Sequence, residues 1–189
     1  MGSGIRIKSV KPDAMTAEQS AAAAILASGP RGAVRGPFAV LLNSPGAFRA
    51  TQSLGSYLRF ESTIPASLRE LAIIVTAQHW RQAYEWQVHS NLAREAGIDE
   101  SAITEIAAGQ APTSLLPDEL AIYNFCRQLH LTGTVDDETF ASAEAVLGTP
   151  EMVDLCAICG YYAMLAMVMN VAQNPLPDGP SPFVTISQA

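Results

Sequence analysis

The sequence has few charged residues and very little lysine. Charged residues make up 15% of the 189 residues, against roughly 25% in an average soluble domain, and Lys8 and Lys11 are the only lysines. Eighteen acidic and eleven basic residues give a net charge of −7, without any run of basic residues. Binding to nucleic acid requires a concentrated cationic surface. The sequence therefore predicts that nucleic acid is not a partner.

Cysteines are few and odd in number: Cys126, Cys156 and Cys159. An odd count, together with an N-terminus that has no apolar leader, argues against a disulfide framework and for a reducing compartment. We therefore expect a cytoplasmic protein. Cys156 and Cys159 have redox spacing but lie in an apolar segment, so we interpret them, like Cys126, as inert core thiols. They would also make a poor zinc site, and we expect no metal.

The sequence lacks an uncharged apolar run long enough to span a bilayer. The longest, residues 155–169, has 15 residues, against about 20 for a membrane helix, and Asn170 follows it. We expect a buried core helix and no membrane association. Hydrophobic residues nevertheless reach 49%, and the mean hydropathy is +0.17. That is more apolar surface than one 20 kDa core comfortably hides, so we expect a homo-oligomer.

Alternating strand patterns are almost absent, because apolar residues recur at spacings of three and four. The sequence therefore predicts an all-α fold of about eight helices. We expect an N-terminal arm at 1–12, a single domain at 13–173 and a proline-rich tail at 174–189. Expected helices, placed from capping residues, prolines and glycines, cover about 14–28 (capped by Asp13), 38–43, 46–61, a segment opened by Pro65, 84–95, 99–108, 117–131, 137–147 and 149–172.

Glu85 and His89 are the most informative pair of polar residues. They are four positions apart, which places both on one face of a helix. A carboxylate beside an imidazole is a typical general acid/base pair. Nearby Trp86, Tyr84 and Trp80 supply aromatic walls for a small flat ligand. The alternative is a surface Glu–His pair on an amphipathic helix.

Glu70 precedes Glu85 by fifteen residues, which is roughly 22 Å along one straight helix. The two carboxylates share a site only if the chain turns back within residues 78–82, where neither glycine nor proline requires a break. Otherwise Glu70 is a helix-surface acid beside Arg69.

An anionic substrate needs a cation, and Arg81 is the first candidate because it lies next to this expected break. Arg59 and Arg35 follow. His79 and His130 have no carboxylate three or four residues away, so we interpret them as structural or exposed.

The segments RELAIIV (69–75), AYEWQVH (83–89) and LAREAGI (92–98) resemble the core of the carboxymuconolactone decarboxylase family, within the alkylhydroperoxidase-D-like superfamily. The resemblance is good over about 65–110. LPDELAIYNF (116–125) and GYYAMLAMVMN (160–170) are similar to the longer members of about 180 residues. The resemblance implies the superfamily's helical fold. It also implies trimers or hexamers, often with the site near a subunit interface.

The peroxidase branch of this superfamily has a Glu, a Cys-x-x-Cys and a His, and this sequence keeps two of these parts. Glu70 and His89 match the Glu and the His, while Gln82 and Glu85 replace both thiols, so thiol peroxidase chemistry is not expected here. Resemblance to the decarboxylase branch implies that Glu85 and His89 transfer protons, with Glu70 as a relay. It implies a carboxy-lyase-like enzyme, without a cofactor, for an anionic unsaturated lactone acid from aromatic catabolism. A thiol-dependent redox protein and a non-catalytic oligomeric binding module are the alternatives.

Overall fold

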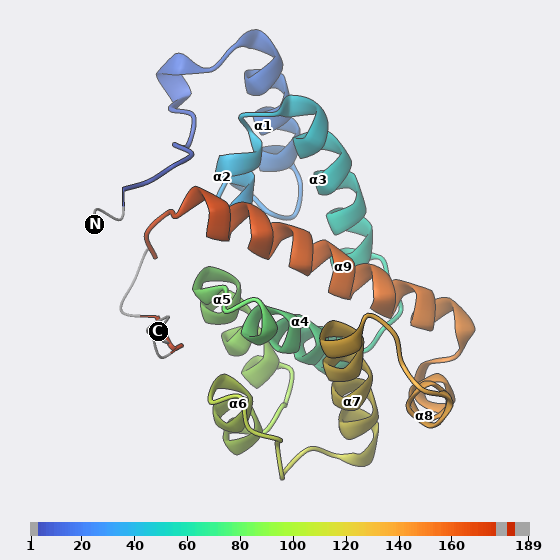
Figure 1. Cartoon of the computed structure of the whole chain (residues 1–189). Helices are drawn as coiled ribbons and strands as arrows, with labels where there is room; N and C mark the ends of the chain where they lie inside the picture. Colours follow the sequence, from blue (N-terminus) through green and yellow to red (C-terminus); the bar gives the residue numbers. More distant parts are fainter. Residues whose placement is uncertain (1–3, 177–180, 184–189) are drawn as a thin grey trace. The chain divides into compact units, whose positions relative to one another are not determined.

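The computed structural model describes residues 4–176 and 181–183, and these residues form helices and loops without any strand (Figure 1). The all-α prediction is therefore confirmed. Two compact units divide the chain. The first holds residues 1–61 and 164–175, and the second holds 62–163 and 176–189. The expected division into arm, single domain and tail stays a prediction, and part of that tail (177–180 and 184–189) lies outside the described residues.

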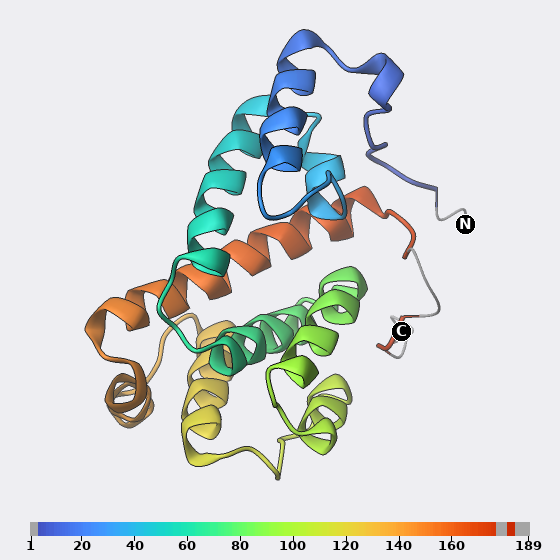
Figure 2. The ribbon, with the colours of Figure 1, turned by 180° about the vertical axis from the view of Figure 1, so that it is seen from behind.

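In the described residues, the first unit holds a short 3-10 turn, α1, α2, α3 and the last part of the C-terminal helix, and α1 and α2 both pack against α3. Its core includes the edge-to-face pair Phe38 and Phe48, whose ring centroids are 5.4 Å apart. The guanidinium of Arg31 covers the Phe38 ring at 4.8 Å, which is a cation–π distance. The elements, which Figures 1 and 2 show from opposite sides, are η1 (Pro12–Ala14), α1 (Ala17–Ser28), α2 (Pro37–Leu41) and α3 (Pro45–Phe60).

The first helix starts later than expected. Asp13 lies in the 3-10 turn, and Thr16 is the residue that caps α1. The Thr16 side chain accepts a hydrogen bond from the Gln19 amide, and the Gln19 side chain accepts one from the Thr16 amide. This reciprocal capping box satisfies two otherwise unpaired donors, which a lone aspartate cannot do. The expected Asp13 cap is therefore wrong by three residues.

The second unit is organised around one central helix, α4. Residues 71–77 of α4 are all buried, because α5, α6 and α7 pack on it (Figures 1 and 2). This burial on all sides explains why the segment is apolar around its whole circumference. The helices are α4 (Ala66–His79), α5 (Ala83–Glu95), α6 (Glu100–Ala107), α7 (Pro117–Thr132), α8 (Asp137–Leu147) and the first part of α9 (Thr149–Ala172).

Most helix ends in this unit follow the expected signals. Pro117 opens α7, and Gly133 ends it in the left-handed conformation with φ 76°. Asp136 caps α8 by accepting from the Thr139 amide. Pro65 is an exception, since it precedes the first residue of α4 and lies outside the helix.

Helix α9 has 24 residues and, by length and composition alone, could cross a membrane; 61% of its most apolar window is buried inside the protein. The uncharged run of 15 residues is only part of this helix, whose bounds agree with the expected 149–172, so length alone does not distinguish a core helix from a membrane helix. At the start of α9, the hydroxyls of Ser62 and Thr63 donate hydrogen bonds to Asp154 and Glu151 at 2.7 and 2.6 Å. These bonds tie the beginning of α9 to the segment that leads into α4.

Candidate functional site

The chain turns back sharply between α4 and α5. Helix α4 ends at His79, and α5 begins at Ala83. Arg81 takes a left-handed backbone conformation with φ 50°, which is unusual for a residue other than glycine. The amide of Gln82 donates to the Ala77 carbonyl, and the Gln82 side chain caps α5 by accepting from the Tyr84 amide. The break that the sequence permitted is therefore present, and it lays α5 along α4.

This turn brings Glu70 to His89. The Oε2 atom of Glu70 lies 2.6 Å from Nδ1 of His89, a short hydrogen bond between two helices. An ionised carboxylate only accepts hydrogen bonds, so Nδ1 is the donor. The ring orientation and tautomer of His89 are thereby set by Glu70. The interpretation of Glu70 as a surface acid is wrong, since only 4% of the residue is exposed.

Glu85 faces the opposite edge of the same imidazole. Its Oε2 atom lies 3.6 Å from Nε2 of His89, so the i,i+4 pair expected on α5 is present. Because Nδ1 donates to Glu70, Nε2 is the nitrogen that faces Glu85. The result is a carboxylate–imidazole–carboxylate row in which His89 lies between two acids.

All three members of this row are buried. Glu85 is 3% exposed and His89 is 2% exposed. Withdrawing ionisable groups from water is costly unless they pair with one another, and these groups pair through His89. Arg69 supplies a nearby cation, with its Nε atom 3.5 Å from Oε1 of Glu70. Such concentration of buried ionisable groups is typical of functional sites more than of helix surfaces.

Tyr162 on α9 completes the surroundings of the imidazole. Its ring meets the His89 ring edge to face, with centroids 4.9 Å apart, and Tyr161 packs on Tyr162 in the same manner at 5.2 Å. The sequence analysis did not single out either tyrosine. The available signal was two adjacent aromatic residues in an otherwise aliphatic helix.

Two of the other expected site residues are linked through Phe183. The Trp86 ring meets Phe183 edge to face at 5.5 Å, and the Arg81 guanidinium lies over the same ring at 5.6 Å. Trp86 is buried, and Tyr84 is half-buried. Trp80, at the end of α4, meets His79 edge to face at 5.6 Å.

The two cysteines that lie together are not the two with redox spacing. Cys126 and Cys159 are buried with their sulfur atoms 3.6 Å apart, whereas Cys156 is exposed. The core interpretation of Cys156 is therefore wrong, because residues three apart on α9 do not face the same side here. The hydrogen bond with Cys126 lowers the pKa of Cys159 to about 6, helped by His130 and Thr76, while the pKa of Cys126 is raised.

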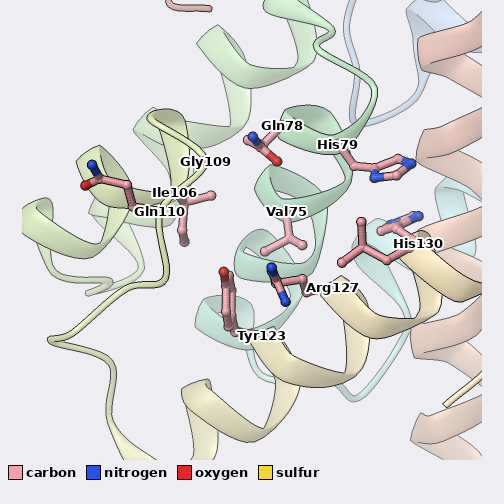
Figure 3. A pocket seen from close by; sticks show the side chains of 10 residues that line it. Val75, Gln78, His79, Ile106, Gly109, Gln110, Tyr123, Arg127 and His130 are labelled. Carbon is pink, nitrogen blue, oxygen red and sulfur yellow. The ribbon is translucent and has the colours of Figure 1, made fainter.

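A separate cavity of about 210 Å³ lies among α4, α6 and α7 (Figure 3). His79 and His130 line it with their rings stacked, centroids 5.0 Å apart and planes at 18°. His79 is exposed, in agreement with the interpretation from the sequence, and His130 is half-buried, but their contact was not expected. They lie on different helices, and no spacing along the chain indicates that they meet.

Within residues 4–176 and 181–183, no group of three or more histidine, cysteine, aspartate or glutamate side chains is arranged to hold a metal ion.

Comparison with known proteins agrees with this architecture. Residues 45–128 match the model of the carboxymuconolactone decarboxylase family, a segment that contains Glu70, Glu85 and His89. A solved structure described as the alkylhydroperoxidase AhpD core of an uncharacterised peroxidase-related protein from Ralstonia eutropha JMP134 superposes with a TM-score of 0.73 at 17% identity, covering 92% of this chain and 94% of that one. No curated protein shows a significant match. The resemblance inferred from the sequence and the superfamily's helical fold are both confirmed.

Proposed function

We propose that this chain, in which residues 45–128 belong to the carboxymuconolactone decarboxylase family, is a cofactor-free acid/base enzyme for a small unsaturated lactone or carboxylic acid. The observation that carries the proposal is the buried row Glu70–His89–Glu85. A buried imidazole held between two carboxylates is suited to moving a proton to and from a carbon beside a carbonyl group.

The geometry supports different roles for the three residues of the row. Glu70 fixes the imidazole by accepting from Nδ1, so it is a positioning residue. His89 then uses Nε2 for proton transfer, and Glu85, 3.6 Å from Nε2, is the group with which it exchanges the proton. The resemblance seen in the sequence implied that Glu85 and His89 transfer protons, with Glu70 as a relay. In the proposal Glu85 and His89 keep that role, and Glu70 becomes the positioning residue.

Each of the proposed reactions requires the row to move a proton to or from a carbon atom of the substrate. In a decarboxylation, the bond to the carboxylate carbon breaks, carbon dioxide leaves, and the electron pair forms a dienolate that His89 protonates on carbon. In an isomerisation or ring opening, the same row removes a proton from a carbon next to the carbonyl and returns one elsewhere. Burial strengthens every interaction with the developing charge, because little water competes.

The substrate in this proposal is anionic, and Arg81 is the cation assigned to it. Arg81 lies in the turn between α4 and α5, two residues after the end of α4, and its guanidinium lies over Phe183. Trp86, Tyr84 and Trp80 are proposed as apolar walls. We further propose that the chain acts in the cytoplasm as a homo-trimer or hexamer, in the context of aromatic compound catabolism. The apolar composition supports that assembly.

The test is the His89→Gln variant, assayed for turnover of unsaturated lactone acids such as carboxymuconolactone. We expect a fall in kcat of at least about a hundredfold, in line with the loss of a general acid/base. Asn91→Ala, an exposed position on the same helix, is the matched control and should keep full activity. A folded His89→Gln protein that turns over these acids as fast as the parent would refute the proposal.

A second candidate function, thiol-dependent redox chemistry, is favoured by one observation. The sulfur atoms of Cys126 and Cys159 are 3.6 Å apart, so a peroxide substrate that takes up their two electrons and two protons would join them in a disulfide after a small movement. If an isolated protein forms this disulfide reversibly and keeps its activity when His89 is replaced, the redox function is the better one.

A further inference from the structure

The cavity among α4, α6 and α7 uses none of the residues assigned to the proposed function. Its volume is about 210 Å³, and its walls come entirely from the second unit. Figure 3 shows Val75 of α4, Ile106 of α6, and Tyr123 and Arg127 of α7 around this space. Its polar lining consists of Gln78, His79, Gln110, Tyr123, Arg127 and His130.

The charge of this lining is opposite to that of the protein. The chain carries eighteen acidic residues against eleven basic ones, yet no carboxylate is among the residues that line the cavity in the described part of the chain. Arg127 is a permanent cation, and His79 and His130 each become cationic on protonation. Arg127 also lies close enough to Tyr123 to act electrostatically on its phenol. An anion in this cavity would meet hydrogen-bond donors and positive charge.

The stacked imidazoles are held in place by a hydrogen bond to α4. The Thr76 hydroxyl donates to the Ala72 carbonyl, so at 2.8 Å it accepts from Nε2 of His130. That bond fixes the position of the His130 ring at the cavity wall. His79 stacks on it, and burial followed by repulsion from His130 lowers the pKa of His79. An anion beside the stack would offset this repulsion between the two rings.

The remaining lining is apolar. Val75, Ile106 and Leu131 line the cavity together with the cationic group. A ligand that fits both parts has one anionic end and a compact hydrocarbon body.

We propose that this cavity is a binding site for a small monocarboxylate with a hydrocarbon body. The carboxylate is held by Arg127 and the two imidazoles, and the hydrocarbon body lies against Val75, Ile106 and Leu131. The site is distinct from the row around His89. It shares helix α4 with that row, because Glu70 and His79 lie on this one helix.

The three histidines allow both sites to be observed in one experiment. We would titrate the full chain with benzoate and follow the ring C–H resonances of His79, His89 and His130 by NMR. Benzoate should shift His79 and His130 together along one saturable curve. Benzamide, which has the same shape without the charge, should bind at least about tenfold more weakly, because charge-assisted hydrogen bonds are the stronger ones.

Two variants test the two ends of the ligand. Arg127→Gln, at an exposed position on α7, should weaken benzoate binding about tenfold or more. Leu131→Asn, also exposed, should weaken benzoate about threefold and leave acetate unchanged, since acetate has little hydrocarbon to bury. Arg49→Gln is the control, because its ion pair with Glu18 is exposed and in the first unit. Circular dichroism establishes that each variant is folded.

The inference is overturned if benzoate leaves His79 and His130 unmoved, if benzamide binds equally well, or if Arg127→Gln binds benzoate like the parent. If benzoate shifts only the His89 resonances, the result supports the proposed active site and refutes the cavity site. If it shifts only the His79 and His130 resonances, the result supports the cavity site, whether or not the proposed activity is found.

Discussion

Oε2 of Glu70 lies 2.6 Å from Nδ1 of His89, although the two residues are nineteen positions apart and belong to different helices. The contact exists because the chain reverses at Arg81 and lays α5 on α4. Both side chains are buried, so the hydrogen bond cannot be exchanged for water without a large penalty. It makes Glu70 the group that orients the imidazole, and it leads directly to the first prediction.

Glu70→Gln should lower kcat by about 10 to 100-fold with little change in KM, as is usual for residues that orient a functional histidine. The amide keeps the size of the carboxylate and removes its charge. A nitrogen-15 spectrum of the His89 ring should show a changed tautomer, which a merely structural role would not produce. Glu95→Gln, exposed on α5, is the control. A kcat within twofold of the parent would contradict the positioning role.

Tyr162→Ala should destabilise the protein by about 3 kcal/mol, because it removes a buried ring and leaves a cavity beside His89. Tyr162→Phe keeps the ring, so the free energy of unfolding should fall much less. Urea unfolding of both variants measures the difference. If Tyr162→Ala unfolds at the same urea concentration as the parent, the ring does not support the site.

Arg81→Asn should raise KM for an anionic lactone about tenfold while leaving stability nearly unchanged. Asparagine tolerates the left-handed conformation that Arg81 adopts, so the turn between α4 and α5 is kept, while the charge and its contact with the Phe183 ring are lost. Steady-state kinetics with a thermal melt on the same sample separate the two effects. An unchanged KM would remove Arg81 from the substrate site.

The NMR titration midpoint of His79 should lie below the ordinary value of 6.5, because burial first and His130 second lower its pKa. The unfolded chain then binds the proton more readily, so this contribution to stability is complete above pH 6.5 and is lost as the pH falls through the folded pKa. His130→Asn should raise the His79 midpoint part of the way back. A midpoint at or above 6.5 in the parent would show that the stacked pair is not formed.

Iodoacetamide should label Cys156 in the native protein and leave Cys126 and Cys159 unmodified, because only Cys156 is exposed. Mass spectrometry of the digested protein identifies the labelled residue, and labelling in urea should reach all three thiols. Rapid native labelling of Cys159 would mean that its thiolate, favoured by a pKa of about 6, is reached through local opening.

Helix boundaries were predictable where the signal is local. Proline at the start of α7, glycine in the left-handed position after it and Asp136 at the cap of α8 act within one turn of the chain, and the sequence shows them directly. The expected cap at Asp13 was wrong, because the cap of α1 is set by the reciprocal bonds between Thr16 and Gln19, three residues later.

The site was partly predictable for the same reason. Glu85 and His89 share a helix face, so their proximity follows from helix geometry alone. Tyr162 and Phe183 reach the site from more than seventy residues away, and no pattern near Glu85 indicates them.

The sequence by itself determined an all-helical protein and the proximity of Glu85 to His89, because helix periodicity and an i,i+4 spacing are local. It also showed the resemblance to the carboxymuconolactone decarboxylase family, with which the match over residues 45–128 agrees. Only the tertiary structure decided that Glu70 is buried on His89, that Cys159 pairs with Cys126, and that His79 stacks on His130. Each of these contacts joins two helices, and their partners are set by how α4, α5, α7 and α9 pack.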